Sequence, residues 1–342
     1  MATILWTGDR GFIAGYVIQN LLDEGHVVVG IDNDWKYGPV ERTYDSHLNY
    51  EHHNGDAKDK GLLDCMFENY KPDYFVMGAA IIGGISMFHE LAYDLFAENE
   101  RITATALDTA IKYFKEGSLK KVLAISSSMV YESTNKYPSA EGDQRLIPPP
   151  LSTYGFQKLA VEYFIQGAHE QYKLPYTIIR PFNCVGVGEQ RAKVDKEVMS
   201  GNIKLAMSHV VPDIIQKIVK GQYPVHILGE GNQLRYYTYG GDLADGFVNA
   251  LFNPAALNED FNLSTPNGHT VLELAKLIWD RLEPNKPFQY VSDVPFKYDV
   301  QKRQPDVTKA KQILGFEATT SLEKALDEII PWAVEMIKQG KI

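Results

Sequence analysis

Segment 121–172 contains the residues whose types and spacing are best suited to chemistry. An apolar run, KVLAI, ends in three serines, Ser126 to Ser128, and a loop then leads into a helical pattern that begins near Tyr154. Tyr154 and Lys158 are four residues apart, so both side chains lie on one face of that helix, with Cβ atoms ~5–6 Å apart. Because a fixed cation favours the charged form of tyrosine, we predict that Lys158 lowers the pKa of Tyr154 and makes it a general base.

A serine at the end of the preceding strand can share this chemistry. One of Ser126, Ser127 and Ser128 can hydrogen-bond the same substrate oxygen from which Tyr154 removes a proton. Removal of a hydroxyl proton supports oxidation of an alcohol to a ketone when a hydride acceptor lies beside it. The rest of the chain must therefore provide a site for such an acceptor.

The N-terminal residues predict a dinucleotide site. An apolar run at 2–7 breaks at Gly8 and Gly11, and residues 12–24 have the periodicity of an amphipathic helix. The glycines let the backbone approach a pyrophosphate, which the helix N-terminus binds through free N–H groups. The next run, 26–31, ends in Asp32, where a carboxylate binds the adenosine ribose and repels a 2′-phosphate. We therefore expect NAD rather than NADP.

Strands and helices alternate along the first half of the chain. We predict further strands at 48–53, 74–79, 121–126 and 176–180, and helices at 62–70, 94–114 and 154–172. This alternation is typical of an α/β protein with a Rossmann-type, doubly wound parallel sheet and ligands at the carboxyl ends of its strands. The proline-rich loop before helix 154–172 is expected to cover the site.

After residue 183 the expected elements are shorter. Helices are predicted at 210–220, 241–252, 271–282 and 321–338, and strands at 225–228, 234–239, 261–263 and 288–291. We assign 1–183 to an NAD-binding Rossmann domain, with a return segment near 225–258. Residues 184–342 form a smaller α/β domain that binds the substrate.

Composition excludes several classes of protein. The chain has 342 residues, 44% of them hydrophobic, which is enough for a large core. Its formal net charge of −10 argues against a nucleic-acid partner. Two cysteines, Cys65 and Cys184, are too few for a disulfide framework or a structural zinc site. Without a signal sequence or an apolar run near ~20 residues, we expect a cytoplasmic protein with no membrane segment and no metal.

Several motifs together resemble the extended short-chain dehydrogenase/reductase superfamily, and within it the NAD-dependent nucleotide-sugar epimerases and dehydratases. They are TGDRGFIAG at 7–15, the strand ending in Asp32, ISSSMVY at 125–131 and the Tyr154–Lys158 pair. Segments 180–183, 210–215, 229–246 and 303–316 are similar to further motifs of this family, so the resemblance covers nearly the whole chain. It implies that Ser127, Tyr154 and Lys158 are the catalytic residues and that NAD is the cofactor.

The resemblance also implies the ligand contacts. Cofactor-binding residues are expected to be Gly8, Gly11, Phe12, Ile13, Asp32, Asn33, Asp56, Ala57, Ala79, Ala80, Asn99, Tyr154, Lys158 and Pro181. Substrate-binding residues are expected to be Gly83, Ser127, Ser128, Asn183, Val211, Arg235 and Arg303. The two arginines suit the diphosphate of a nucleotide sugar, because guanidinium groups bind phosphate oxygens in pairs. Helices 94–114 and 154–172 are expected to form a homodimer, as in this family.

Departures from the family patterns reduce the number of reactions that this enzyme could catalyse. Ser128 and Met129 stand where 4,6-dehydratases have an Asp-Glu pair, and methionine cannot transfer a proton, so elimination of water is disfavoured. Met129 also stands where 3,5-epimerases have an acid/base thiol. We predict epimerisation at carbon 4 by transient oxidation to a ketosugar and return of the hydride. The alternatives are a reductase, a dehydrogenase or a 3,5-epimerase of the same fold, or a non-catalytic dinucleotide-binding protein.

The nucleotide base stays open among UDP, GDP, CDP and dTDP. Segment 79–85 is similar to the Ala-Ala-x-x-Gly-Gly-Ile of enzymes that act on GDP-sugars, whereas Asp32, Asn33 and Asn99 are similar to the UDP-sugar 4-epimerases. Cys184 is either a proton carrier near the sugar or a buried packing residue. Glu132 replaces a glycine that commonly follows the Val-Tyr of the motif.

Overall fold

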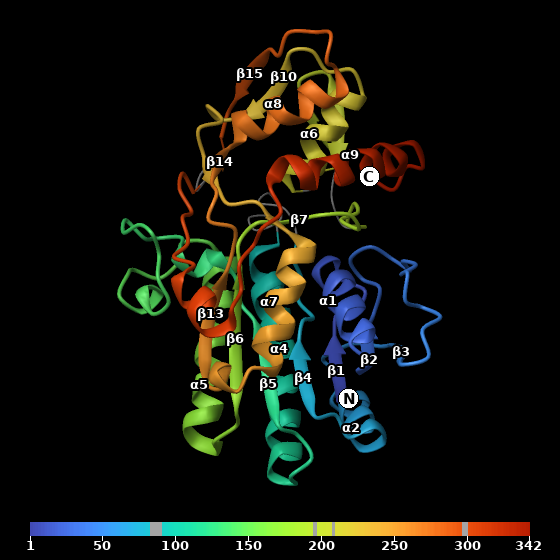
Figure 1. Cartoon of the computed structure of the whole chain (residues 1–342), viewed down its shortest axis with the longest axis vertical. Helices are drawn as coiled ribbons and strands as arrows, with labels where there is room; N and C mark the ends of the chain where they lie inside the picture. Colours follow the sequence, from blue (N-terminus) through green and yellow to red (C-terminus); the bar gives the residue numbers. More distant parts are fainter. Residues whose placement is uncertain (83–90, 194–196, 207–208, 296–299) are drawn as a thin grey trace.

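The computed structural model describes residues 1–82, 91–193, 197–206, 209–295 and 300–342. Its centre is a seven-stranded sheet in the order β13-β6-β5-β4-β1-β2-β3, and all neighbouring strands of this sheet are parallel (Figure 1). The strands are β1 (Thr3–Thr7), β2 (Val27–Asp32), β3 (Tyr50–Asn54), β4 (Tyr74–Met77), β5 (Lys121–Ile125), β6 (Tyr176–Pro181) and β13 (Glu259–Leu263). The order places β4 at the centre, and β1 lies between β4 and β2.

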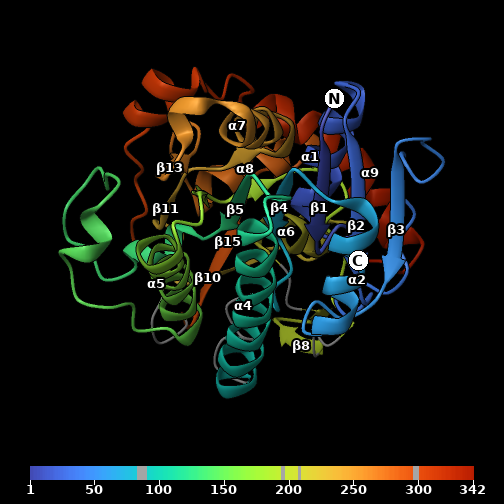
Figure 2. The ribbon, with the colours of Figure 1, turned by 90° about the horizontal axis from the view of Figure 1, so that it is seen from below.

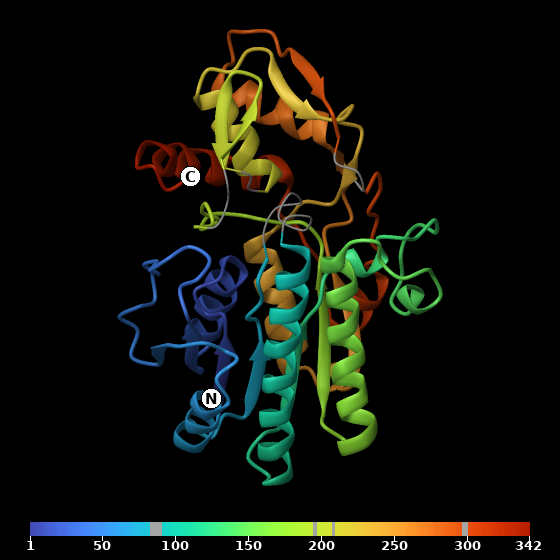
Figure 3. The ribbon, with the colours of Figure 1, turned by 180° about the vertical axis from the view of Figure 1, so that it is seen from behind.

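Helices cover both faces of the sheet, as the views from below and from behind show (Figures 2 and 3). One face carries α1 (Phe12–Asp23) and α7 (Gly240–Phe252). The other carries α2 (Lys60–Tyr70), α4 (Ala92–Lys115) and α5 (Thr153–Tyr172). Successive strand residues point to opposite faces, so Ile4 packs against the first group of helices and Leu5 against the second. This architecture confirms the predicted Rossmann-type α/β fold.

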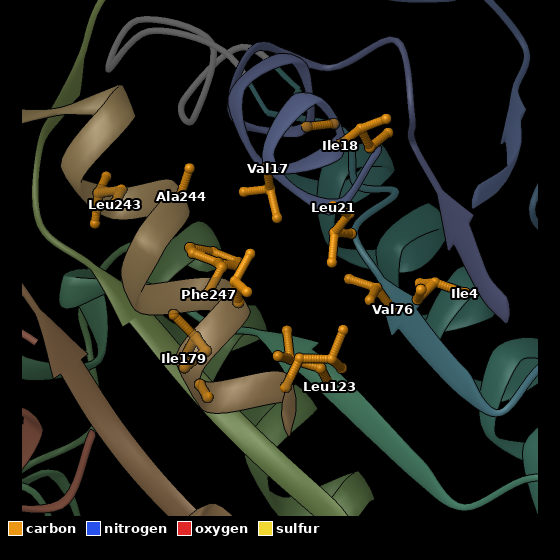
Figure 4. Close-up of a cluster of buried hydrophobic side chains, with 14 of the residues drawn as sticks. Ile4, Val17, Ile18, Leu21, Val76, Leu123, Ile179, Leu243, Ala244 and Phe247 are labelled. Carbon is orange, nitrogen blue, oxygen red and sulfur yellow. The ribbon is translucent and has the colours of Figure 1, made fainter. Parts of the chain in front are cut away.

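The core between the sheet and the helices α1 and α7 is close-packed and apolar (Figure 4). Val17 and Leu21 of α1 and Phe247 of α7 meet Leu123 and Ile179 of the sheet, and all five are at most 1% exposed. Burying each of these side chains contributes roughly 1.5–3 kcal/mol. The packing fixes α1, whose N-terminus borders the site.

Segments after β6 build a smaller unit beyond the carboxyl ends of the strands (Figure 1). Its helices are α6 (Val210–Val219), α8 (Val271–Leu282) and α9 (Leu322–Lys338). Four two-stranded sheets accompany them, formed by β7 (Cys184–Val185) with β12 (Thr238–Tyr239), β8 (Glu197–Ser200) with β9 (Ile203–Ala206), β10 (Val225–Leu228) with β15 (Tyr290–Asp293), and β11 (Leu234–Arg235) with β14 (His269–Thr270). The three helices share one apolar core with β10.

Two expectations about this half of the chain need correction. The return segment expected near 225–258 does supply α7, but its strand β10 pairs with β15 in the smaller unit. The strand that joins the large sheet is β13, which begins at Glu259, because the N–H of Asn258 donates to the carbonyl of Tyr176 and sets β13 beside β6. The single strand expected at 234–239 is two short strands that belong to different sheets. The domain boundary at residue 183 stays a prediction.

Short helical turns lie between the main elements: η1 (Ser128–Tyr131), η2 (Asp143–Arg145), η3 (Pro254–Ala256) and η4 (Ala310–Leu314). Among the helices that the structure describes, none combines the length and apolar character needed to cross a membrane.

Candidate active site

The turn after β1 brings the backbone close to its surroundings. Gly8 has a φ of +78°, and its N–H donates to the carbonyl of Ile31 at 2.7 Å. A Cβ at Gly8 would lie 2.8 Å from the nitrogen of Ala79, so only glycine fits. Gly11 is the N-cap residue of α1, and within the described chain no side chain caps this end. The first-turn N–H groups are therefore available to an anion.

Asp32 ends β2 beside this turn. Its carboxylate accepts hydrogen bonds from two backbone N–H groups, at 2.8 and 3.3 Å. Burial raises the pKa of Asp32, and these backbone hydrogen bonds oppose the shift. The side chain of Asn33 donates to the carboxylate of Asp56 at 3.5 Å. Ala57, which follows Asp56 in the sequence, is buried. These four residues gather at the carboxyl ends of β2 and β3, where an adenosine ribose was expected.

Ser127 and Tyr154 meet at the carboxyl end of β5. Ser127 Oγ accepts the N–H of Met129 at 3.2 Å, and its hydroxyl is hydrogen-bonded to that of Tyr154. Both side chains are buried, at 8% and 7% exposure. Burial raises the pKa of Tyr154, while the hydrogen bond with Ser127 and the charges of Arg303 and Lys36 oppose the rise. The site thus pairs Tyr154 with a serine that can share its substrate oxygen.

Lys158 lies one helical turn after Tyr154. Its Nζ donates to the carbonyl of Ile125 at 3.1 Å. Burial lowers the pKa of Lys158 to about 8, and the Glu100 carboxylate opposes this. The structure corrects the expectation that Lys158 lowers the pKa of Tyr154. Burial has the largest effect on the pKa of both side chains, and the cations that lower the pKa of Tyr154 are Arg303 and Lys36.

A cavity of about 330 Å³ joins the glycine turn to the Ser127–Tyr154 pair. This volume is in the range of ligand pockets, ~300–1,000 Å³. The predicted residues that line it are Gly8, Gly11, Phe12, Ile13, Ala80, Ser127, Ser128, Tyr154, Lys158, Pro181, Asn183, Val211 and Arg303. The fold therefore brings together all three predicted catalytic residues, part of the predicted cofactor set and most of the predicted substrate set.

The remaining predicted residues do not line this cavity: Asp32, Asn33, Asp56, Ala57, Ala79, Asn99 and Arg235. Gly83 lies outside the described residues. The amide of Asn99 is bonded to the backbone of Ile81, accepting its N–H at 2.7 Å and donating to its carbonyl at 3.0 Å. Asn99 thus holds the loop after β4 in place.

Arg235 and Arg303 come from adjacent segments. Arg235 is on β11, and its guanidinium donates to the carbonyl of Leu234 at 3.0 Å. The same carbonyl accepts the N–H of Arg303 at 3.3 Å. Arg303 lines the cavity, whereas Arg235 does not.

Several cavity residues were not predicted as site residues, among them Trp6, Lys36, Glu189 and His209. Lys36 follows β2, and its loop is held against the smaller unit because the Lys36 carbonyl accepts the N–H of Lys193 at 2.7 Å. No local sequence pattern predicts such a long-range contact. The one available signal for His209 was its position directly before the family-like VVPDII segment.

Cys184 also lines the cavity. Burial raises the pKa of its thiol, so the sulfur stays protonated at neutral pH and is a weak proton acceptor. Among the described residues, no group of three His, Cys, Asp or Glu side chains is placed to hold a metal ion.

A model of the "NAD dependent epimerase/dehydratase family" matches residues 4–264. The chain belongs to this family. It is 28% identical to the UDP-N-acetyl-alpha-D-glucosaminuronate decarboxylase of Bacillus cytotoxicus, with 97% of this chain and 98% of the relative covered. It is 26% identical to the UDP-glucose 4-epimerase of Halalkalibacterium halodurans, with 97% and 96% covered. The structure of the UDP-glucose 4-epimerase of Thermotoga maritima with UDP-glucose superposes with a TM-score of 0.78 at 27% identity, covering 99% of each chain.

These findings confirm the family, the fold and the prediction of an NAD-dependent nucleotide-sugar epimerase. The site fits NAD in two respects: the backbone at Gly8 leaves no room for a side chain, and the uncapped N-terminus of α1 borders the cavity. Asp32 ends β2 beside the glycine turn, and its contact with the ribose of such a dinucleotide stays a prediction.

Proposed function

We propose that this enzyme epimerises carbon 4 of a UDP-hexose. The observation that carries the proposal is the hydrogen bond between Ser127 and Tyr154, in a cavity that continues to the N-terminus of α1. Bound NAD supplies the acceptor for the hydride of carbon 4 and later the donor. UDP is favoured as the nucleotide because the similar proteins are named for UDP-sugars.

Tyr154 removes the proton from the 4-hydroxyl group, and Ser127 holds the same oxygen by a hydrogen bond. The ketosugar turns within the cavity and presents its other face, after which Tyr154 returns the proton. Lys158 fixes the position of α5 against β5 through its hydrogen bond to Ile125, and its ammonium binds the nicotinamide ribose. Positioned acid/base groups of this kind contribute ~10²–10⁴-fold to rate.

The nucleotide diphosphate binds at the smaller unit. Arg303 supplies a guanidinium group, and Val211 lies in the first turn of α6, whose N–H groups suit an anion. The buried Oδ1 of Asn183 has no hydrogen-bond partner within the described residues, so it can accept a donor from the substrate. Arg235, whose guanidinium shares the Leu234 carbonyl with the backbone N–H of Arg303, adds positive charge.

The residues after Ser127 support return of the hydride over elimination. Ser128 and Met129 are both buried, at 3% and 4% exposure, and neither carries an acidic group. Water elimination from the ketosugar needs such a group beside the leaving oxygen. The ketosugar is therefore reduced again on the opposite face.

A homodimer through α4 and α5 is part of the proposal. The two helices lie side by side on the outside of the sheet (Figure 3). Large aromatic side chains on them are exposed, among them Tyr93 at 77% and Tyr163 at 58%. The rings of Phe96 and Phe156 stack across the two helices at 5.8 Å. Such a surface is suited to a second copy, and light scattering measures the mass.

The direct test is a panel of UDP-, GDP-, CDP- and dTDP-hexoses with the purified enzyme. The proposal predicts the 4-epimer of a UDP-hexose by NMR, with no accumulation of reduced nicotinamide. Stoichiometric formation or consumption of reduced nicotinamide, or release of carbon dioxide from UDP-glucuronate as the main reaction, contradicts it.

A further inference from the structure

Lys36 brings a positive charge into the cavity for which the described part of the chain provides no anionic partner. It lies on the loop that follows β2, is partly buried and lines the cavity together with Gly8 and Gly11 of the glycine turn. Its Nζ forms no salt bridge with any described residue and lies 4.8 Å from the centre of the Tyr37 ring. An ammonium group placed in a cavity without a counter-ion is suited to an anionic ligand.

The loop between β2 and β3 holds Lys36 in this place (Figure 1). The guanidinium of Arg42, on the same loop, donates to the carbonyl of Gly11 at 3.0 Å and attaches the loop to the glycine turn. The carbonyl of Lys36 accepts the N–H of Lys193 at 2.7 Å and attaches the loop to the smaller unit. Because the loop is held at both places, less conformational entropy is lost when Lys36 binds a ligand.

The charge of Lys36 acts on the interior of the cavity. Burial raises the pKa of Tyr154, and the positive charge of Lys36 is among the influences that oppose this rise. Because the interaction between charges weakens with distance, the ammonium group lies near the catalytic tyrosine as well as near the glycine turn. A dinucleotide that binds at the N-terminus of α1 and reacts beside Tyr154 spans this same region, and its diphosphate is anionic.

The N-terminus of α1 provides only part of the charge that a diphosphate needs. A helix N-terminus carries about +0.5 elementary charge. The two arginines beside the turn have other partners in the described chain, since Arg10 pairs with Asp45 and Arg42 donates to backbone carbonyls. Among the described residues at this turn, Lys36 therefore supplies the cation that is left for a ligand.

We propose that Lys36 and the N-terminus of α1 together bind the diphosphate of NAD, and that Lys36 keeps the cofactor in the enzyme between turnovers. A UDP-sugar also contains a diphosphate. Lys36 is assigned to the cofactor because it follows β2 and lines the cavity beside the glycine turn, whereas the N–H of Arg303 is bonded to Leu234 of the smaller unit. The inference rests on NAD as the cofactor and does not depend on which carbon is epimerised.

The test measures ligand binding to the full chain by titration calorimetry after removal of bound nucleotide. NAD, ADP-ribose and UDP are titrated separately, because ADP-ribose keeps the diphosphate of NAD and lacks the nicotinamide. Loss of one charge-assisted phosphate contact in Lys36→Met should raise the dissociation constants of NAD and ADP-ribose roughly 10- to 100-fold. The dissociation constant of UDP should stay unchanged. In gel filtration of the NAD-loaded proteins, the wild type should retain NAD and Lys36→Met should lose it.

Two further variants separate the effect of charge from an effect on folding. Lys36→Arg keeps the positive charge and should bind NAD within a few-fold of wild type. Lys60→Met is the matched control, because it removes a lysine of α2 that pairs with Asp64 at 3.0 Å and does not line the cavity. It should leave the affinities for all three ligands unchanged.

Three binding results overturn the inference. The first is wild-type affinity of Lys36→Met for NAD and ADP-ribose. The second is an equal loss of affinity in Lys36→Arg and Lys36→Met, which means that the charge is not what binds. The third is weaker binding of UDP with unchanged binding of NAD, which assigns Lys36 to the substrate diphosphate. Loss of NAD by the wild type in gel filtration overturns the retention of the cofactor. These results leave the proposed function standing, because that function is tested by the sugar product and not by cofactor affinity.

Discussion

Glu132 accepts two hydrogen bonds from Ser152, one from its backbone N–H at 3.0 Å and one from its hydroxyl at 2.7 Å. Ser152 is the N-cap residue of α5, and its Oγ in turn accepts the N–H of Gly155 at 3.0 Å. The carboxylate thereby ties the turn that follows Ser127 to the start of the helix that carries Tyr154. Glu132 therefore connects η1 to the N-terminus of α5.

The Glu132→Ala variant should lose this link. Removing an acceptor from a helix N-terminus costs ~1–2 kcal/mol of stability, which lowers the melting temperature. We expect kcat to fall by roughly tenfold, because a small displacement of Tyr154 weakens its acid/base contribution. Glu132→Gln keeps an acceptor oxygen and should recover most of kcat. A Glu132→Ala enzyme with wild-type kcat would show that the link does not position the tyrosine.

Gly8 provides a test of the dinucleotide site. The Gly8→Ala variant places a Cβ 2.8 Å from the backbone of Ala79 at a φ of +78°, so the turn must shift and NAD affinity should fall by at least ~100-fold. The matched control is Gly167→Ala in α5, where a Cβ meets no atom within 4 Å. This control should retain NAD and gain up to ~1 kcal/mol of stability. Calorimetric titration measures the NAD affinity of the two variants. Equal affinity argues against the assignment of Gly8 to the dinucleotide site.

Lys158 makes the stability depend on pH. Its pKa is about 8 in the folded chain and near the ordinary 10.5 when unfolded, so the unfolded state binds more protons between these values. The free energy of unfolding should therefore rise with pH across this window, by at most about 3 kcal/mol from this residue. Lys121 has a similarly lowered pKa and contributes in the same direction.

The Lys158→Met variant isolates that contribution, because Lys121 is present in both proteins. Urea unfolding at pH 7.5 and pH 9.5 should give a smaller increase in the free energy of unfolding for the variant than for the wild type. Equal increases would mean that Lys158 is not a buried group with a lowered pKa.

Arg303 should act on substrate binding. Loss of a charge-assisted phosphate contact in Arg303→Met is expected to raise KM for the UDP-hexose roughly 10- to 100-fold, with a smaller effect on kcat. The control is Arg281→Met, which removes an arginine bonded to Asp327 away from the cavity. Arg281→Met should leave KM close to wild type. Steady-state kinetics distinguishes the two, and a wild-type KM in Arg303→Met excludes the proposed contact.

Local patterns in the sequence were sufficient to predict those parts of the site that depend on one turn or one helix. Gly8 marks a tight turn because no side chain fits its backbone. Tyr154 and Lys158 share a helix face because of their spacing, and Ser127 meets Tyr154 because the carboxyl ends of parallel strands face one edge. Their proximity was therefore predictable, although the direction of the pKa shift of Tyr154 was not, since it depends on burial.

Other residues reach the site through contacts that no local pattern encodes. Lys36 enters the cavity because its loop is bonded to Lys193, far away in the sequence. Glu189 and His209 come from separate loops of the smaller unit and meet only in the folded chain. β13 joins the sheet through its pairing with β6, although the smaller unit separates them along the chain. Long-range pairing of short segments determines all three placements.

The most direct test of the account is the turnover of Tyr154→Phe with a UDP-hexose that the wild-type enzyme epimerises. The variant lacks the hydroxyl group that exchanges the substrate proton but keeps the ring that packs in the site. The account predicts that kcat falls by about 10²–10⁴-fold, with NAD binding and melting temperature close to wild type. A kcat within a few-fold of wild type would contradict the assignment of Tyr154 as the acid/base residue of carbon-4 epimerisation.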